Sequence, residues 1–199
     1  MSANIKLERK NEIMKIASDL FYSKGIADTT ISEITYIANI GKGTFYQYFK
    51  NKEDVIDEYI KTSFQNMYTL IDEQIDNFKT NKEKIFFIVK SLFMSKATDE
   101  KFTYIFIEFL RLTASKKKKE SKELYEFNQQ NINLISKYLE KGIIEEEFIS
   151  CNNQDIALEI ISSILGNIIL SLSYEFKKCD NSTKDNVQTI LNSIEYKND

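Results

Sequence analysis

The chain has 199 residues, with 27 basic and 30 acidic side chains, a net charge of -3 and no histidine. It is long enough for one large or two small folded units with a real hydrophobic core. Without histidine, metal-ligand spacing, a phosphate-binding loop or a nucleophile elbow, the sequence argues against an enzyme and against a bound metal or other cofactor. Proline is absent and only five glycines occur, so few tight turns are available and an all-α fold is expected.

Compartment and membrane topology can also be predicted from composition. Cys151 and Cys179 make neither a disulfide framework nor a metal site, and we expect two free thiols in a reducing compartment. The first ten residues lack the apolar segment of a secretion signal. The uncharged run at residues 160–174 has 15 residues, whereas a bilayer requires about 20 apolar ones. These features predict a cytoplasmic protein without a membrane segment.

An apolar stripe of helical period begins the chain and predicts a first helix from about Lys6 to Gly25, where the glycine is expected at the C′ position. The stripe consists of Ile13, Ile16, Ala17, Leu20 and Phe21. At the start of this helix, Lys6, Arg9 and Lys10 either approach a DNA phosphate or form a solvated helix end. Both interpretations stay open.

Two short helical segments follow between Thr30 and Lys52. Thr30 and Glu33 have the spacing of a capping box, which predicts a helix over about residues 30–38. Asn39 and Gly41 then allow a sharp turn, because both residues tolerate positive φ. The apolar positions of the first segment recur at helical spacing: Ile31, Ile34, Ile37 and Ala38.

The second segment, residues 42–49, is predicted to place donors and aromatic rings on its outer faces. Phe45 and Phe49 share one face at a spacing of four residues and are expected to be buried. Lysine is the only charged residue type from Gly41 to Lys52, and such a surface suits DNA, which repels acids. Residues 1–62 as a whole hold nine basic and nine acidic side chains, so any attraction to DNA must be local. The polar outer positions are Lys42, Thr44, Tyr46, Gln47 and Tyr48.

The stretch A-N-I-G-K-G-T-F-Y-Q-Y-F-K-N-K-E-D-V resembles the helix-turn-helix signature of the tetracycline-repressor (TetR) family of bacterial transcription regulators. Two positions depart from the usual pattern. Asn39 stands where the family commonly has a turn glycine, and Gly41 stands where a capping serine is common; both changes are expected to weaken DNA affinity without removing the fold. The matching residues are Ala38, Gly43, Thr44, Tyr46, Tyr48, Phe49 and Lys52.

The resemblance, combined with side-chain chemistry, predicts a set of DNA-binding residues. Gln47 is suited to a bidentate contact with adenine and Lys42 to donation to guanine, each contributing about 1–3 kcal/mol of discrimination. Thr44, Tyr46 and Tyr48 are expected at phosphates, with core packing as the alternative for the two tyrosines. Lys52 inherits a phosphate-binding role from the resemblance alone. The complete predicted set is Thr30, Lys42, Gly43, Thr44, Tyr46, Gln47, Tyr48 and Lys52.

Amphipathic segments account for the rest of the chain and bring the total to about nine helices. A helix from about residue 51 to 78 is expected to link a DNA-binding domain, 1–50, to a ligand-binding and dimerisation domain, 51–199.

The segment 100–113 is compatible with a strand, but helix is favoured because turn signals are lacking around it. Lys116–Lys119 is interpreted as a solvated loop in preference to a nucleic-acid contact. Gly142 is expected to end a helix over 123–141, and Glu145–Glu147 to form a solvated loop. Further helices are predicted at 82–96, 153–176 and 185–194.

The helix at 153–176 is apolar on nearly every face and must be covered on more than one side. A homodimer through the last two helices, as the resemblance implies, would cover it. Its predicted interface residues are Ile161, Leu165, Ile168, Ile169, Leu172 and Ile190. Aromatic residues on the segments that surround the pocket of the family are candidates for an effector site, although plain core packing is the commoner role of such residues. They are Phe86, Phe93, Phe102, Phe106, Phe109 and Tyr125.

These features predict a ligand-responsive transcriptional regulator, expected to be a repressor. As a homodimer it would bind a near-palindromic operator in double-stranded DNA and be released by a small apolar or aromatic effector. The alternative is a helix-turn-helix protein that has become a protein-binding adaptor and no longer binds DNA.

Overall fold

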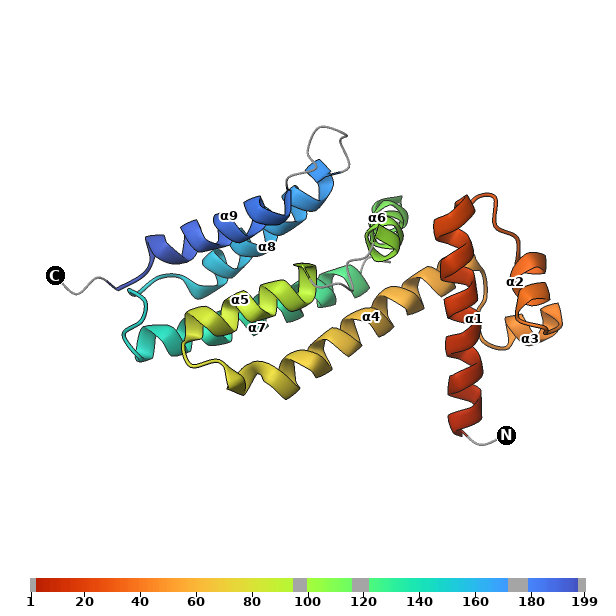
Figure 1. The fold of residues 1–199 in the computed structure, drawn as a ribbon, viewed down its shortest axis with the longest axis horizontal. Coiled ribbons are helices and arrows are strands. Elements are labelled where there is room, and N and C mark those ends of the chain that lie inside the picture. Colours follow the sequence, from red (N-terminus) through yellow and green to blue (C-terminus); the bar gives the residue numbers. More distant parts are fainter. Residues whose placement is uncertain (1–2, 95–99, 116–121, 172–178, 197–199) are drawn as a thin grey trace. The chain divides into compact units, whose positions relative to one another are not determined.

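The computed structural model describes residues 3–94, 100–115, 122–171 and 179–196 (Figure 1). Within these ranges the only β-structure is an isolated bridge between Phe148 and Glu195. The all-α prediction is confirmed, as is helix in preference to strand over 100–113. The α-helices are α1 (Ala3–Lys24), α2 (Ile31–Ile37), α3 (Lys42–Tyr46), α4 (Lys52–Gln74), α5 (Asn81–Val89), α6 (Glu100–Ser115), α7 (Lys122–Ile144), α8 (Asn153–Ser171) and α9 (Cys179–Ser193), with a 3-10 turn at Ile75–Asn77 and a π-helical turn at Lys90–Met94.

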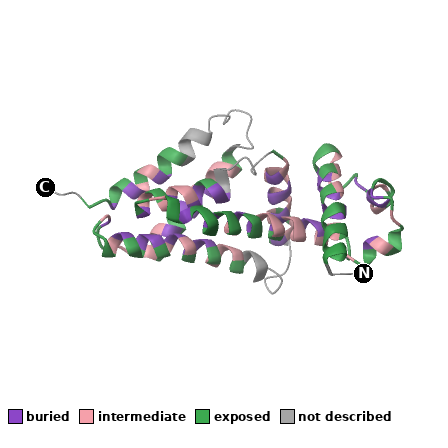
Figure 2. Ribbon diagram, turned by 60° about the horizontal axis from the view of Figure 1, so that its bottom comes forward, coloured by how far each residue is buried: buried purple, intermediate pink, exposed green. Residues whose placement is uncertain are grey.

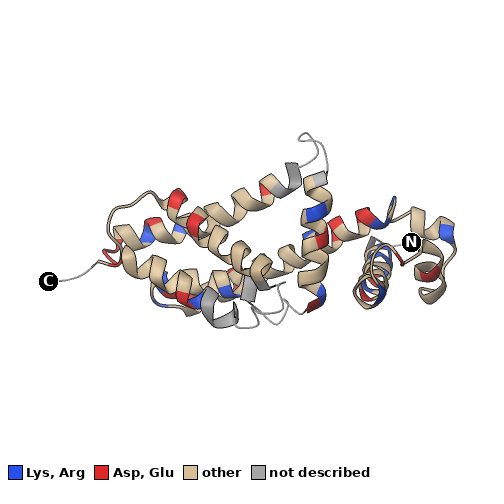
Figure 3. Cartoon of the chain, turned by 90° about the horizontal axis from the view of Figure 1, so that it is seen from above, with Lys and Arg blue, Asp and Glu red and all other residues tan. Residues whose placement is uncertain are grey.

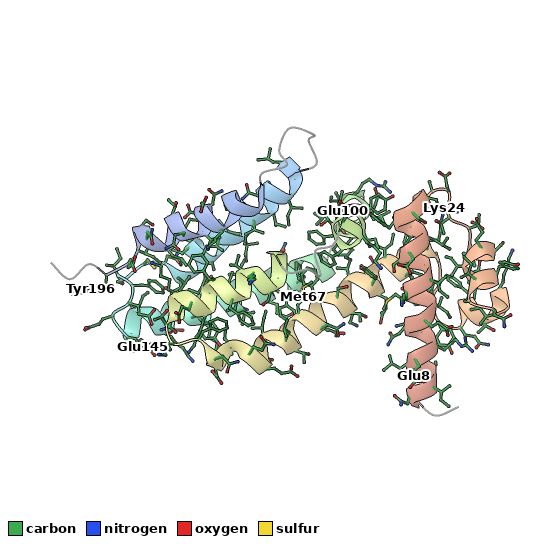
Figure 4. All side chains as sticks on the ribbon, viewed as in Figure 1. Glu8, Lys24, Met67, Glu100, Glu145 and Tyr196 are labelled. Atoms are coloured by element: carbon green, nitrogen blue, oxygen red, sulfur yellow. The ribbon has the colours of Figure 1, made fainter. Side chains whose placement is uncertain are left out.

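The chain forms two compact units. Unit 1 contains residues 1–66 and 97–117, and unit 2 contains residues 67–96 and 118–199. The boundary falls inside α4, where Met67 is labelled in Figure 4. The division into domains at 1–50 and 51–199 remains a prediction.

Unit 1 contains the helix-turn-helix, and its turns have the backbone geometry that the sequence predicts. Gly25 has φ 91° and donates its N–H to the carbonyl of Phe21 at 2.9 Å, as expected of a residue just beyond a helix end. Asn39 has φ 50°, in the left-handed region. Side chains that α1 and α2 contribute to the core include Ile13, Ala17, Phe21, Ile34 and Ala38.

Two details of this region differ from expectation. Ile37 is 54% exposed and does not join the buried stripe of α2, which is made by Ile34 and Ala38. The second helix ends at Tyr46, not at Phe49, because the backbone N–H groups of Gln47 and Tyr48 bond only three residues back, at 3.2 and 2.9 Å, in tighter turns. Phe49 still donates to the carbonyl of Phe45 at 3.0 Å, so both rings keep one face and are buried.

Aromatic packing joins α4 to α6 within unit 1. Phe64 contacts Phe102 and Phe106 edge-on, with ring centroids 5.7 and 6.0 Å apart. Phe106 also stacks on Phe102 and on Phe109 along α6. The three α6 phenyl rings are therefore part of a hydrophobic core.

In unit 2, α7 packs against α5 and α8, and α8 packs against α9. Gly142 does not end α7, which continues to Ile144. A Cβ at residue 142 would lie 2.3 Å from the ring of Phe148, so the glycine makes room for that ring. The left-handed turn occurs further on, at Glu146 with φ 57°.

The N-terminus of α5 shows that Glu145–Glu147 is not simply a solvated loop. Buried Asn81 donates from Nδ2 to Glu145 at 2.7 Å and to Glu147 at 2.9 Å, and its backbone N–H also donates to Glu147 at 2.9 Å. Lys82 bonds to Glu195 at 2.8 Å. Glu145 and Glu147, just after α7, and Glu195, just after α9, therefore hold the N-terminus of α5 in place.

Several predictions concern residues outside the described ranges: Lys116–Lys119, and the part of the 153–176 helix beyond Ser171. Cys151 is a half-buried free thiol whose pKa is raised by burial. Among the described helices, none combines the length and the apolar character required to cross a membrane.

Candidate nucleic-acid interface

The N-terminus of α2 is fixed by a capping box. Thr30 accepts the backbone N–H of Glu33 through its hydroxyl, and the Glu33 carboxylate accepts the backbone N–H of Thr30 at 2.9 Å. Lys24, at the end of α1, forms an ion pair with the same carboxylate. The bond from Lys24 and those from Thr30 lower the pKa of Glu33 from 4.5 to about 2. Thr30 thus has a structural role at the position where the sequence predicts a DNA contact.

Helix α3 buries one face in the core of unit 1 and exposes the opposite face to solvent (Figure 2). Phe45 and Phe49 are buried, with ring centroids 5.7 Å apart. Lys42, Gly43 and Gln47 are exposed, and Tyr46 is 55% exposed. Thr44 and Tyr48 are half-buried. The outward face of α3 therefore offers one ammonium, one amide and one phenol.

Lys52 is engaged inside unit 1. Its ammonium donates to the backbone carbonyls of Ile26 and Thr29, the latter at 2.7 Å. Thr29 is itself buried, and its hydroxyl donates to the carbonyl of Gly25 at 2.8 Å. Lys52 therefore fastens the loop between α1 and α2, a contact that sequence reasoning missed because its two ends are more than twenty residues apart.

A second exposed aromatic residue was also missed. Tyr36 is 85% exposed on α2 and lies next to exposed Ile37. The signal was its position two residues after buried Ile34, which places it off the buried stripe of a helix. Tyr36 adds a phenol to the exposed surface of the helix-turn-helix.

The basic residues at the start of α1 are largely paired within unit 1. Both signs of charge occur along this helix (Figure 3). Arg9 pairs with Glu12 at 2.7 Å, and Lys10 pairs with Glu58 at 2.6 Å while its ammonium lies 5.6 Å from the ring centre of Phe49. These pairs favour a solvated helix end over phosphate contact for Arg9 and Lys10.

The predicted interface residues of unit 2 differ in exposure. Ile161 is buried within the protomer, Leu165, Ile168 and Ile190 are half-buried, and Ile169 is 57% exposed. Leu172 lies outside the described residues. Leu158, which is 50% exposed, lies eleven residues before Ile169 on α8, about three helical turns away and so on the same face. Leu158, Leu165 and Ile169 form an outward stripe, called here the α8 stripe.

The predicted effector residues do not form one group. Phe102, Phe106 and Phe109 are buried in the core of unit 1. Phe86 is half-buried on α5 in unit 2, and Tyr125 is 64% exposed. The Phe93 side chain lies outside the described residues. Core packing therefore accounts for the α6 rings.

A capped helix, a left-handed turn and a short second helix with an exposed polar face are the arrangement of a helix-turn-helix. Residues 13–59 match the model of the bacterial regulatory proteins of the tetR family. The matched residues run from α1 into α4 and contain the whole helix-turn-helix.

Individual proteins are similar to the chain over the same region or in fold. An HTH-type transcriptional regulator YhgD of Bacillus subtilis is 36% identical over 72 residues, 36% of this chain and 38% of that protein. The matched segment spans less than half the length of the curated relatives. The fold is that of a TetR regulator from Haloarcula marismortui, with TM-score 0.82, 13% identity and coverage of 94% of this chain and 98% of that one. It is also that of a regulator FadR from Bacillus subtilis in complex with stearoyl-CoA, with TM-score 0.75, 20% identity and coverage of 93% and 99%.

Proposed function

We propose that this protein is a homodimeric transcriptional repressor that binds a near-palindromic operator and is released by a small apolar or aromatic effector. The observation that carries the DNA-binding part is the outward face of α3, on which Lys42 and Gln47 are exposed while Phe45 and Phe49 anchor the helix from inside. Two such helices, related by a two-fold axis, would contact two half-sites.

Within this proposal, side-chain chemistry divides the work. Gln47 pairs with adenine and Lys42 donates to guanine, whereas Thr44, Tyr46 and Tyr48 hold phosphates and set the register. The second protomer would dock on the α8 stripe, since an exposed apolar row on an otherwise packed helix is typical of a subunit interface.

For the effector we propose an acyl thioester. The fold neighbour from Bacillus subtilis was solved in complex with stearoyl-CoA, and the shared fold supports the same class of effector here. Effector binding would favour a conformation with lower DNA affinity, and by linkage DNA would lower effector affinity by the same factor.

The test is a gel-shift titration of the purified protein on the DNA upstream of its own gene. We expect retardation at low salt that weakens as salt rises. Lys42→Ala and Gln47→Ala should each reduce the affinity ratio between operator and single-base variants, by about 1–3 kcal/mol of discrimination. Lys15→Ala, an exposed lysine on α1, is the matched control and should leave that ratio unchanged. Absence of retardation at low salt would favour the protein-binding adaptor.

A further inference from the structure

A hydrogen-bonded pair of polar side chains lies inside unit 2. Tyr68 of α4 donates its hydroxyl to Oδ1 of Asn131 of α7 at 2.6 Å. Asn131 is fully buried, and burial raises the pKa of the Tyr68 phenol well above its ordinary value. In this orientation Oδ1 faces the Tyr68 hydroxyl and Nδ2 points away from it.

The amide nitrogen of Asn131 is buried and has no hydrogen-bond partner among the residues that the structure describes. A buried donor without an acceptor costs about 1–3 kcal/mol, and folded proteins retain few of them. Asn is also a poor helix former in the middle of α7, where the neighbouring buried positions Ile132 and Ile135 are apolar. Packing and helix propensity both favour another residue here, which indicates a purpose other than stability.

The helix packed against α7 carries a second irregularity. Directly after α5, the backbone adopts a π-helical turn at Lys90–Met94. Single π-helical turns are rare and are frequently found at functional sites. Unit 2 therefore contains both an unpartnered buried donor on α7 and a π turn directly after the helix that packs against α7.

We propose that Nδ2 of Asn131 donates a hydrogen bond to the thioester carbonyl oxygen of an acyl effector bound in unit 2. This inference rests on the proposed function, which it extends by naming the group that recognises the effector. A neutral carbonyl suits the site because an amide offers only a dipole, whereas a buried anion would require a compensating cation. Tyr68 acts as a positioning residue that holds the amide in the donating orientation.

The first experiment measures the unfolding of the effector-free protein. Replacing both members of the pair by apolar residues of similar shape, Tyr68→Phe with Asn131→Leu, removes the orphaned donor and its partner together. We expect a melting temperature equal to or above that of the wild type, because such a paired replacement is near neutral or stabilising. A clear decrease would show that the pair is a structural element of the core and would overturn the proposal.

The second experiment compares two probes by calorimetric titration: octadecanoyl-CoA and its S-octadecyl thioether, which lacks the carbonyl. One hydrogen bond of about 1.4 kcal/mol corresponds to a tenfold preference of the wild type for the thioester. Asn131→Leu should bind both probes equally, at the affinity of the thioether. Asn133→Leu, an exposed asparagine on the same helix, should keep the wild-type preference.

Equal affinity of the wild type for both probes, or no binding of either, would overturn the proposal. A preference that persists in Asn131→Leu would do the same. The gel shift separates these outcomes from failure of the proposed function, because operator binding by the effector-free protein does not depend on Asn131.

Discussion

Glu33 makes the anchoring of α2 dependent on pH. Its pKa is about 2 in the folded protein and ordinarily 4.5, so between these values the unfolded chain binds more protons than the folded one. The stability contributed by the carboxylate is therefore fully present above pH 4.5 and is lost as the pH falls toward 2. Glu33→Gln keeps a capping side chain but removes the charge.

We accordingly predict that Glu33→Gln lowers the urea midpoint of unfolding at pH 7 and that the difference from the wild type shrinks as the pH is lowered toward 2. Glu12→Gln, in an exposed pair with Arg9, is the control and should change the midpoint little. A difference between Glu33→Gln and the wild type that is the same at pH 7 and pH 3 would contradict the proposed linkage.

Lys52 permits a test between two roles. If it fastens the α1–α2 loop, Lys52→Met leaves the carbonyls of Ile26 and Thr29 without this donor, and the free energy of unfolding should fall by about 1–3 kcal/mol. If it only contacts phosphate, stability should not change while affinity for all DNA sequences falls. Chemical denaturation without DNA distinguishes the two, with exposed Lys50→Met as the control.

At the scale of the residue, the features that depend on neighbouring positions were predicted from the sequence. The capping box of Thr30, the left-handed Asn39 and the buried pair Phe45 and Phe49 all follow from local spacing. The partners of Lys52 and the Tyr68–Asn131 bond did not follow, because residues far apart in sequence meet only after the chain has folded.

At the scale of the element, the end of α7 depends on one glycine. Gly142→Ala would place a methyl group 2.3 Å from the ring of Phe148, and overpacking of this kind costs about 1–3 kcal/mol. Gly41→Ala is the control, since no atom lies within 4 Å of its added Cβ. Thermal unfolding without DNA should show a decrease for the first variant alone, and equal melting temperatures would mean that Phe148 readily moves aside.

Helix positions were predicted well where apolar periodicity was strong, as for α1 and α4, and α6 was predicted from the lack of turn signals around it. Helix ends were predicted less well. The sequence placed the end of a helix at Gly142 because glycine often terminates helices, but here the missing side chain accommodates an aromatic ring from six residues further along the chain.

At the scale of the whole molecule, the α8 stripe tests the proposed dimer. Ile169→Glu should weaken self-association at least tenfold, because a carboxylate buried in an apolar interface lacks a partner. Sedimentation equilibrium measures this, with Ile144→Glu, which alters a 75% exposed residue at the end of α7, as the control. A wild type that is monomeric at micromolar concentration would contradict the dimer.

The α8 stripe also has a consequence for regulation in the cell. If Leu158 and Ile169 are covered only by a second copy of the chain, the stability of the folded protein depends on the protomer concentration by mass action. Promoter occupancy would then rise with roughly the square of protomer concentration at low expression. Under the proposed repressor function, a modest drop in synthesis would therefore produce a disproportionate rise in transcription of the target gene.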